Sequence, residues 1–87
     1  MKLIKTGLFV GTRKDAGNRD TLVKNGISRV LTVDIQPLSE NEIGQDVKTL
    51  YINCLDEPTA DLLTSFDRCI EFIDDGLASN GGVLVHW

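Results

Sequence analysis

A long helical periodicity followed by a short apolar run is the sequence feature that most constrains this fold. Apolar side chains recur at three- and four-residue steps between residues 62 and 77, which is the spacing of one helical face. They are Leu62, Leu63, Phe66, Cys69, Ile70, Ile73 and Leu77. Residues 79–82 (Ser-Asn-Gly-Gly) tolerate the positive φ angles at which helices end, and residues 83–86 (Val-Leu-Val-His) have the composition of a buried strand. Because helical crossovers join parallel strands, this succession predicts an α/β domain with parallel pairing.

Three earlier segments also have strand character. Residues 3–11 alternate loosely and end in Leu-Phe-Val-Gly, residues 27–34 form a β-branched apolar run, and residues 47–53 resume that pattern. Residues 35–46 contain proline, glycine and acidic side chains, a composition typical of an exposed loop. These segments predict a sheet of four to five strands.

Helix boundary signals complete the picture. Asn18 is a candidate N-cap of a short helix, and Gly26 stands where a helix-ending glycine belongs. Pro58 lies just upstream of the long periodic segment, and Thr59 or Asp61 can cap its first turn. We therefore expect a mixed α/β sheet with one long helix and one short helix.

Such a sheet needs cover on both faces, and two helices are too few to provide it. We expect one face to be left bare over several hundred square ångströms. At about 25 cal/mol per Å2, that deficit is comparable with the whole stability of a small domain. The 87 residues are thus predicted to be an incomplete folding unit.

Composition excludes several functional classes. A formal net charge of −4 leaves no excess of lysine and arginine for nucleic acid or for an anionic membrane surface. No segment has the apolar length of a signal peptide or a membrane span, which favours a protein of the cytosol or nucleus. Arg13, Lys14 and Arg19 form a small basic group near the start, more readily explained as a solvated face than as a phosphopeptide contact.

Two cysteines are present, Cys54 and Cys69, fifteen residues apart. Neither belongs to a CxxC motif or has a nearby histidine, so a zinc site is disfavoured and buried, reduced thiols are expected.

The order of the segments resembles the dual-specificity branch of the cysteine-dependent phosphatases over nearly the whole chain. Residues 7–11 are similar to that family's opening strand, residues 22–33 to its first helix and second strand, and residues 51–56 to the strand that leads into its acid loop. Phe66, Ile70 and Phe72-Ile73, followed by Gly82-Val83-Leu84-Val85-His86, resemble the helix and strand that deliver the family's His-Cys signature. The resemblance implies that residues 1–87 are an incomplete dual-specificity phosphatase catalytic domain, without its phosphate loop and following helices.

Within that family, residues 30–34 and 55–69 are most similar to the subfamily whose members carry a zinc-binding domain after the phosphatase domain. No cluster of zinc ligands occurs in these 87 residues, so such a domain would lie beyond them.

The resemblance also implies a mechanism. A cysteine thiolate attacks phosphorus, a loop of backbone N–H groups stabilises that anion, and an arginine six residues later binds the phosphoryl oxygens. Trp87 occupies the nucleophile position here, and an indole supplies no thiolate. Position 60, six after Cys54, is alanine and position 75, six after Cys69, is aspartate, so neither cysteine is followed by the arginine that would bind the phosphoryl oxygens. The 87-residue chain itself is therefore predicted to be inactive and to need no metal or other cofactor.

Two further residues acquire roles from the resemblance. Asp56 matches the loop aspartate that protonates the leaving group, 31 residues before the expected nucleophile, although composition alone would make it a solvated loop or cap carboxylate. Asp61 is a rival in the same region, better explained as a first-turn helix residue. His86, the only histidine, would by itself be an ordinary strand-end residue, whereas the resemblance implies that its ring orients the nucleophile loop.

Two functions of different classes remain open at this point. The first is a protein phosphatase that acts on phosphotyrosine and on phosphoserine or phosphothreonine in a phosphorylated protein substrate, of which these residues are an inactive part. The alternative is a non-catalytic binding module that retains surfaces for a phosphorylated target. An unspecified small α/β domain is the least favoured reading, because it leaves the run of matches unexplained.

Overall fold

The fold is built on a five-stranded sheet. The computed structural model describes residues 1–34, 47–53, 59–79 and 81–86, and for residues 53 and 59–65 it describes the backbone only. In chain order the elements are β1 (Lys2–Lys5), β2 (Leu8–Gly11), α1 (Arg13–Ala16), α2 (Arg19–Lys24), β3 (Ile27–Asp34), β4 (Lys48–Asn53), α3 (Thr59–Ala78) and β5 (Gly82–His86). The strands lie in the order β1-β2-β5-β3-β4, with β1 antiparallel to β2 and all other neighbours parallel. The predicted mixed α/β class is confirmed.

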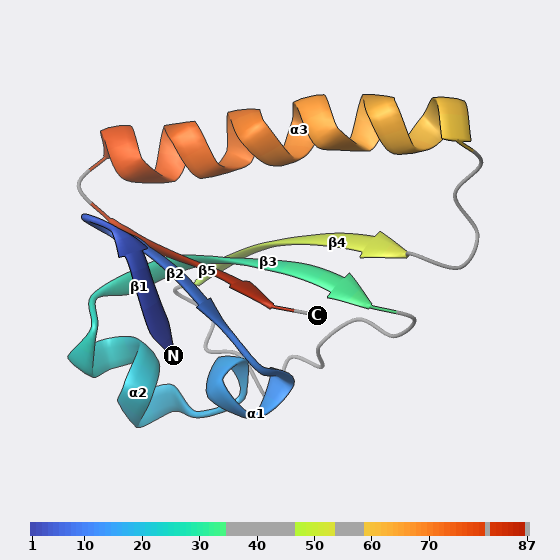
Figure 1. Ribbon diagram of the computed structural model, residues 1–87. Coiled ribbons are helices and arrows are strands. Elements are labelled where there is room, and N and C mark those ends of the chain that lie inside the picture. Colours follow the sequence, from blue (N-terminus) through green and yellow to red (C-terminus); the bar gives the residue numbers. More distant parts are fainter. Residues whose placement is uncertain (35–46, 54–58, 80, 87) are drawn as a thin grey trace.

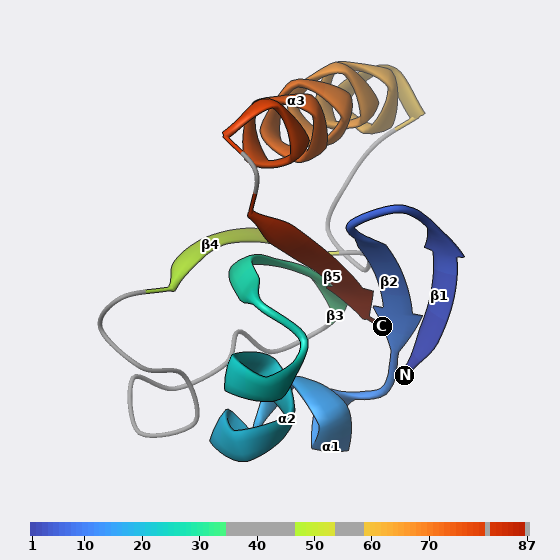
Figure 2. The ribbon, with the colours of Figure 1, turned by 90° about the vertical axis from the view of Figure 1, so that its left-hand side faces the viewer.

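The sheet lies between helices (Figures 1 and 2). The long α3 runs across one face, and the short α1 and α2 lie on the other face. The expectation of a bare face is therefore met only in part, because each face carries helical cover. On α3, however, Phe66 and Ile70 remain 55% and 56% exposed, so part of the predicted apolar helix face has no cover among the described residues.

The first strand segment differs from its prediction. Residues 3–11 form a hairpin rather than one strand, because Gly7 adopts a left-handed φ of 83° and turns β1 back onto β2. The register then pairs Lys2 with Val10 and Leu3 with Phe9.

A second short helix, α1, also goes beyond the prediction. Its cap is a capping box: the Asp15 N–H donates to the Thr12 hydroxyl at 3.2 Å, and the Thr12 N–H donates to the Asp15 carboxylate at 3.0 Å. For α2 the predicted boundaries are confirmed, with Asn18 as the N-cap and Gly26, at φ 66°, just after the C-cap.

The main core lies between the sheet and the two short helices. Its buried members are Ala16, Leu22, Ile27, Val30 and Leu84, with Met1, Phe9 and Val47 packed against them. Since side chains alternate along a strand, residues 30, 32 and 34 of β3 and residues 84 and 86 of β5 share this face.

On the opposite face, Gly76 of α3 lies tightly against the sheet. A Cβ atom added there would lie 2.6 Å from Val83 Cγ2 and 2.7 Å from Arg29 Cδ, so only glycine fits this contact. Four residues earlier on the helix, the ring of Phe72 lies under the Arg29 guanidinium, 5.0 Å from its centroid. No helix in the described part of the chain is both long enough and apolar enough to span a membrane.

Candidate functional site

The carboxyl ends of four parallel strands meet at one edge of the sheet (Figure 1). There β2 ends at Gly11, β5 at His86, β3 at Asp34 and β4 at Asn53. The register places His86 between its neighbours, opposite Gly11 on β2 and opposite Thr32 on β3. In parallel α/β sheets, ligands bind at this edge. The edge is therefore the candidate functional site, and β5 is its central strand.

His86 is completely buried at the end of β5. Its Nε2 lies 2.8 Å from the hydroxyl oxygen of Thr32, which is itself only 2% exposed. Both side chains are on the face covered by the short helices, next to Leu84 in the core. His86 was predicted from the sequence as a site residue. Thr32 was not, although a hydroxyl within the apolar run of residues 30–33 is a signal that could have singled it out.

An ion pair between α1 and β3 lies at the same edge of the sheet. The Arg13 Nη1 atom of α1 lies 3.0 Å from the Asp34 Oδ2 atom at the end of β3. Arg13 follows β2 and Asp34 ends β3, and β5 lies between these two strands. Both side chains are about one-third exposed, so the Coulomb attraction is partly screened.

The ion pair divides the basic group that the sequence suggested. Arg13 faces Asp34, whereas Lys14 and Arg19 are exposed. Next to Arg13 on α1, the Asp15 carboxylate accepts a hydrogen bond from the Thr12 backbone, which holds its pKa below the usual value against a smaller opposing effect of burial. The amino terminus of Met1, 3.4 Å from Asp15, lowers that pKa further.

Several predicted site residues lie outside the described residues. These are Asp56, Trp87 and Cys54, together with the side chain of Asp61. The general acid and the residue at the nucleophile position therefore stay predictions.

Cys69 lies on α3, away from the carboxyl edge, and is half-buried with a free thiol. Burial raises its pKa, and the nearby Arg68 guanidinium offsets this only in part. A raised pKa keeps the thiol protonated, which is the opposite of what a nucleophile needs. The sequence predicted a buried, reduced thiol, and the structure shows a free thiol that is only half-buried.

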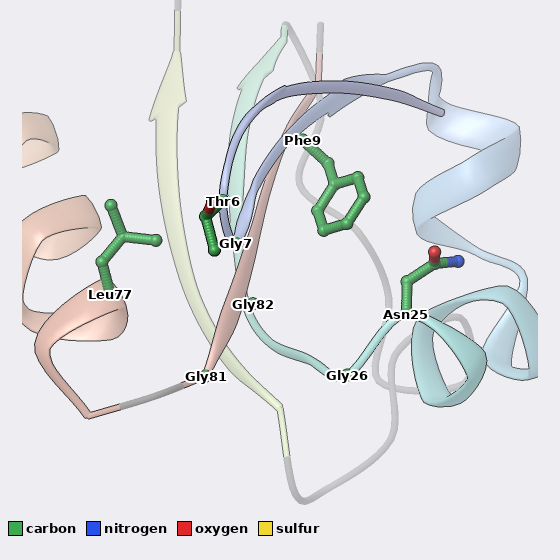
Figure 3. Close-up of a pocket in the computed structure, with 8 residues that line it drawn as sticks. All are labelled: Thr6, Gly7, Phe9, Asn25, Gly26, Leu77, Gly81 and Gly82. Carbon is green, nitrogen blue, oxygen red and sulfur yellow. The ribbon is translucent and has the colours of Figure 1, made fainter.

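A cavity of about 310 Å3 lies at the other edge of the sheet, where β2, β3 and β5 begin (Figure 3). Its lining residues are Thr6, Gly7, Phe9, Asn25, Gly26, Leu77, Gly81 and Gly82. No charged side chain is among its lining residues. Across the described segments, no group of three or more histidine, cysteine or acidic residues could hold a metal ion. The cavity and the candidate site thus lie at opposite edges of the sheet.

Comparison with known proteins gives consistent relatives, although no family model matches the chain. The chain is 36% identical over 84 residues to dual specificity protein phosphatase 12 of Rattus norvegicus, covering 95% of this chain and 25% of that protein. The crystal structure of DUSP15 is similar with a TM-score of 0.83 at 30% identity, covering 99% of this chain and 53% of that one. The human tyrosine phosphatase-like serine/threonine/tyrosine-interacting protein is similar with a TM-score of 0.77 at 29% identity, covering 99% and 60%. The chain thus spans about a quarter of the curated relative and about half of the solved neighbours.

Proposed function

We propose that these 87 residues are the first part of a phosphatase catalytic domain and that they end where the nucleophile loop would begin. The proposal proceeds from the homology of this chain to the dual-specificity protein phosphatases. The observation that supports this most directly is the position of His86. It closes the central parallel strand, it is buried, and its ring is held by Thr32 at the edge where such sheets bind ligands. That is where the resemblance expects the histidine of a His-Cys signature.

The proposed reaction is hydrolysis of a phosphate monoester in a phosphorylated protein through a cysteinyl-phosphate. The proposed compartment is the cytosol or nucleus, where free thiols are kept reduced. The 87 residues alone are expected to show no turnover. Neither cysteine is followed by an arginine six residues on, and the half-buried Cys69 thiol has a raised pKa.

Asp56 is the proposed general acid, since it follows the β4 strand whose carboxyl end lies at the site edge. Asp61 provides a matched control, because it is also a carboxylate and lies five residues further along the chain. If the assignment is right, replacing Asp56 removes the proton donor, whereas replacing Asp61 changes only a first-turn helix charge.

A chimera tests this proposal. Residues 1–86 are joined to the nucleophile loop and remaining phosphatase domain of the rat relative, and turnover is measured with a phosphotyrosine peptide. We expect the chimera to hydrolyse the peptide, Asp56→Asn to lower kcat by about 10²–10⁴-fold, and Asp61→Asn to change it only slightly. A chimera that folds but does not turn over would contradict the proposal, and a comparable loss in both variants would remove the assignment of Asp56.

A non-catalytic binding role is the alternative. It is favoured by the likeness to the phosphatase-like interacting protein, whose name describes interaction. Calorimetric titration of the 87-residue chain with a phosphopeptide and with its unphosphorylated form distinguishes the two roles. Selective binding of the phosphopeptide supports the binding role, and equal or absent binding counts against it.

A further inference from the structure

The cavity where β2, β3 and β5 begin lies at the edge of the sheet opposite the candidate site, so it takes no part in the proposed reaction. Half of its lining residues are glycines, namely Gly7, Gly26, Gly81 and Gly82. Because glycine has no side chain, these strand ends leave space between the two helical layers. Figure 3 shows Leu77 of α3 on one side of the strand ends and Phe9 and Asn25 on the other.

The space is large enough for a small molecule. A Cβ atom added at Gly26 would meet no atom within 4 Å, so the room beside this residue is open. The cavity measures about 310 Å3, and Phe9 and Leu77 give it apolar walls. Since a cavity of about 150 Å3 is enough to hold benzene, this one has room for a bicyclic ring.

The main chain around the cavity offers hydrogen-bond acceptors in preference to donors. The N–H groups of Gly26, Gly81 and Gly82 are all donated to backbone carbonyl oxygens of the protein. The carbonyl oxygen of Gly7 accepts from Val83 N–H at 2.7 Å, and that of Gly26 accepts from Gly82 N–H at 2.8 Å. A carbonyl oxygen has two lone pairs, so each can accept a second hydrogen bond.

We propose that this cavity binds a small neutral aromatic molecule with an N–H or O–H donor, for which indole is the probe. The ring would pack against Phe9 and Leu77, and its donor would bind a carbonyl oxygen at the strand ends. An anionic ligand would meet carbonyl oxygens instead of donors, and burying its charge there would be unfavourable. This binding is independent of the proposed phosphatase reaction.

A titration of the ¹⁵N-labelled 87-residue chain with indole tests the proposal. Glycine amides have their own region in a ¹H–¹⁵N spectrum, so the four lining glycines report the cavity and Gly11 reports the opposite edge of the sheet. We expect saturable shifts at the lining glycines and little change at Gly11. The expected Kd is on the order of 1 mM, a value typical of a ligand of this size.

Two related molecules test the chemistry of the ligand. N-methylindole keeps the bicyclic ring and loses the donor, so we expect it to bind about 2- to 10-fold more weakly than indole. Indoleacetate adds a carboxylate, and we expect it to give no saturable shift at the lining glycines.

A matched pair of variants tests the location. Gly26→Asn places a side chain in the open space, and asparagine tolerates the left-handed φ of 66° at this position. We expect it to weaken indole binding roughly tenfold, as overpacking of a filled site does. Gly17→Asn makes the same change at the exposed glycine that ends α1 and should leave the Kd unchanged. The chimera described above is titrated in the same way, so the result does not depend on the shorter chain folding alone.

The absence of saturable shifts at the lining glycines in both proteins would overturn the inference. So would indoleacetate that binds as tightly as indole, or a Gly26→Asn variant with an unchanged Kd. Equal affinities for indole and N-methylindole would refute the hydrogen bond to the strand ends. An inactive chimera that still binds indole would contradict the proposed phosphatase function and leave the cavity site standing.

Discussion

The tight contact between Gly76 of α3 and the sheet predicts that Gly76→Ala destabilises the fold. The added methyl would lie 2.6 Å from Val83 Cγ2 and 2.7 Å from Arg29 Cδ, well inside van der Waals contact. Val83 is fully buried on the central strand and cannot move away, whereas the Arg29 stem can adjust. Overpacking of this kind costs about 1–3 kcal/mol, and the better helix propensity of alanine returns up to about 1 kcal/mol. We therefore expect a net loss of roughly 1–2 kcal/mol.

Urea unfolding followed by circular dichroism measures that loss. A change of this size lowers the Tm of a domain of this length by about 4–16 °C. Asp74→Ala serves as the control, because it adds alanine at an exposed position of the same helix and should change stability by less than about 0.5 kcal/mol.

A double-mutant cycle identifies the cause of the loss. Val83→Ala removes the methyl group nearest the new side chain, so the cost of Gly76→Ala should be smaller in that background than in the wild type. A Gly76→Ala variant as stable as the wild type would refute the packing argument. Additive effects in the cycle would show that some contact other than Val83 limits the helix.

Two further predictions concern titratable groups. The pKa of Asp15 is lowered, chiefly by the hydrogen bond from the Thr12 backbone, so the ionised carboxylate stabilises the fold above the unfolded pKa of about 3.9, and this contribution is lost as pH falls through the folded value. Asp15→Asn should therefore be less stable than the wild type near pH 6 and should differ less from it near pH 2. Acid titration followed by circular dichroism checks this expectation. Burial raises the pKa of the Cys69 thiol. In a Cys54→Ser background, alkylation of Cys69 at pH 7.5 should therefore be slower in the folded chain than in the chain unfolded by urea. Faster alkylation in the folded chain would show an activated thiol instead.

Local patterns in the sequence were enough to predict most of the secondary structure. The periodicity that ends at Leu77 predicted α3, and the Asn18 and Gly26 signals predicted both ends of α2. The capping box from Thr12 to Asp15 could have been recognised in the same way, since it too is a local pattern. The hairpin was harder to predict, because its turn depends on the φ angle of a single glycine.

The site could be predicted only where it depends on local sequence. His86 was found as the end of an apolar strand, but its contact with Thr32 joins residues 54 positions apart. The pair of Arg13 and Asp34 likewise depends on α1 and β3 meeting across β5. Strand order decides both contacts, and no short sequence pattern contains the strand order. Asp56 remains a prediction because it lies outside the described residues.

The position of β5 in the sheet has a consequence for the order of events during synthesis. It is made after the other four strands of the described sheet, yet it lies between β2 and β3, and Leu8 pairs with Val83, which is far away along the chain. Until β5 leaves the ribosome, no strand pairing joins the hairpin of β1 and β2 to the pair of β3 and β4 in the described sheet. Non-local pairing of this kind slows folding and leaves strand edges open in the meantime. The nascent chain is therefore expected to carry two half-sheets without strand pairing between them, open to chaperones or to misassembly, until β5 is inserted.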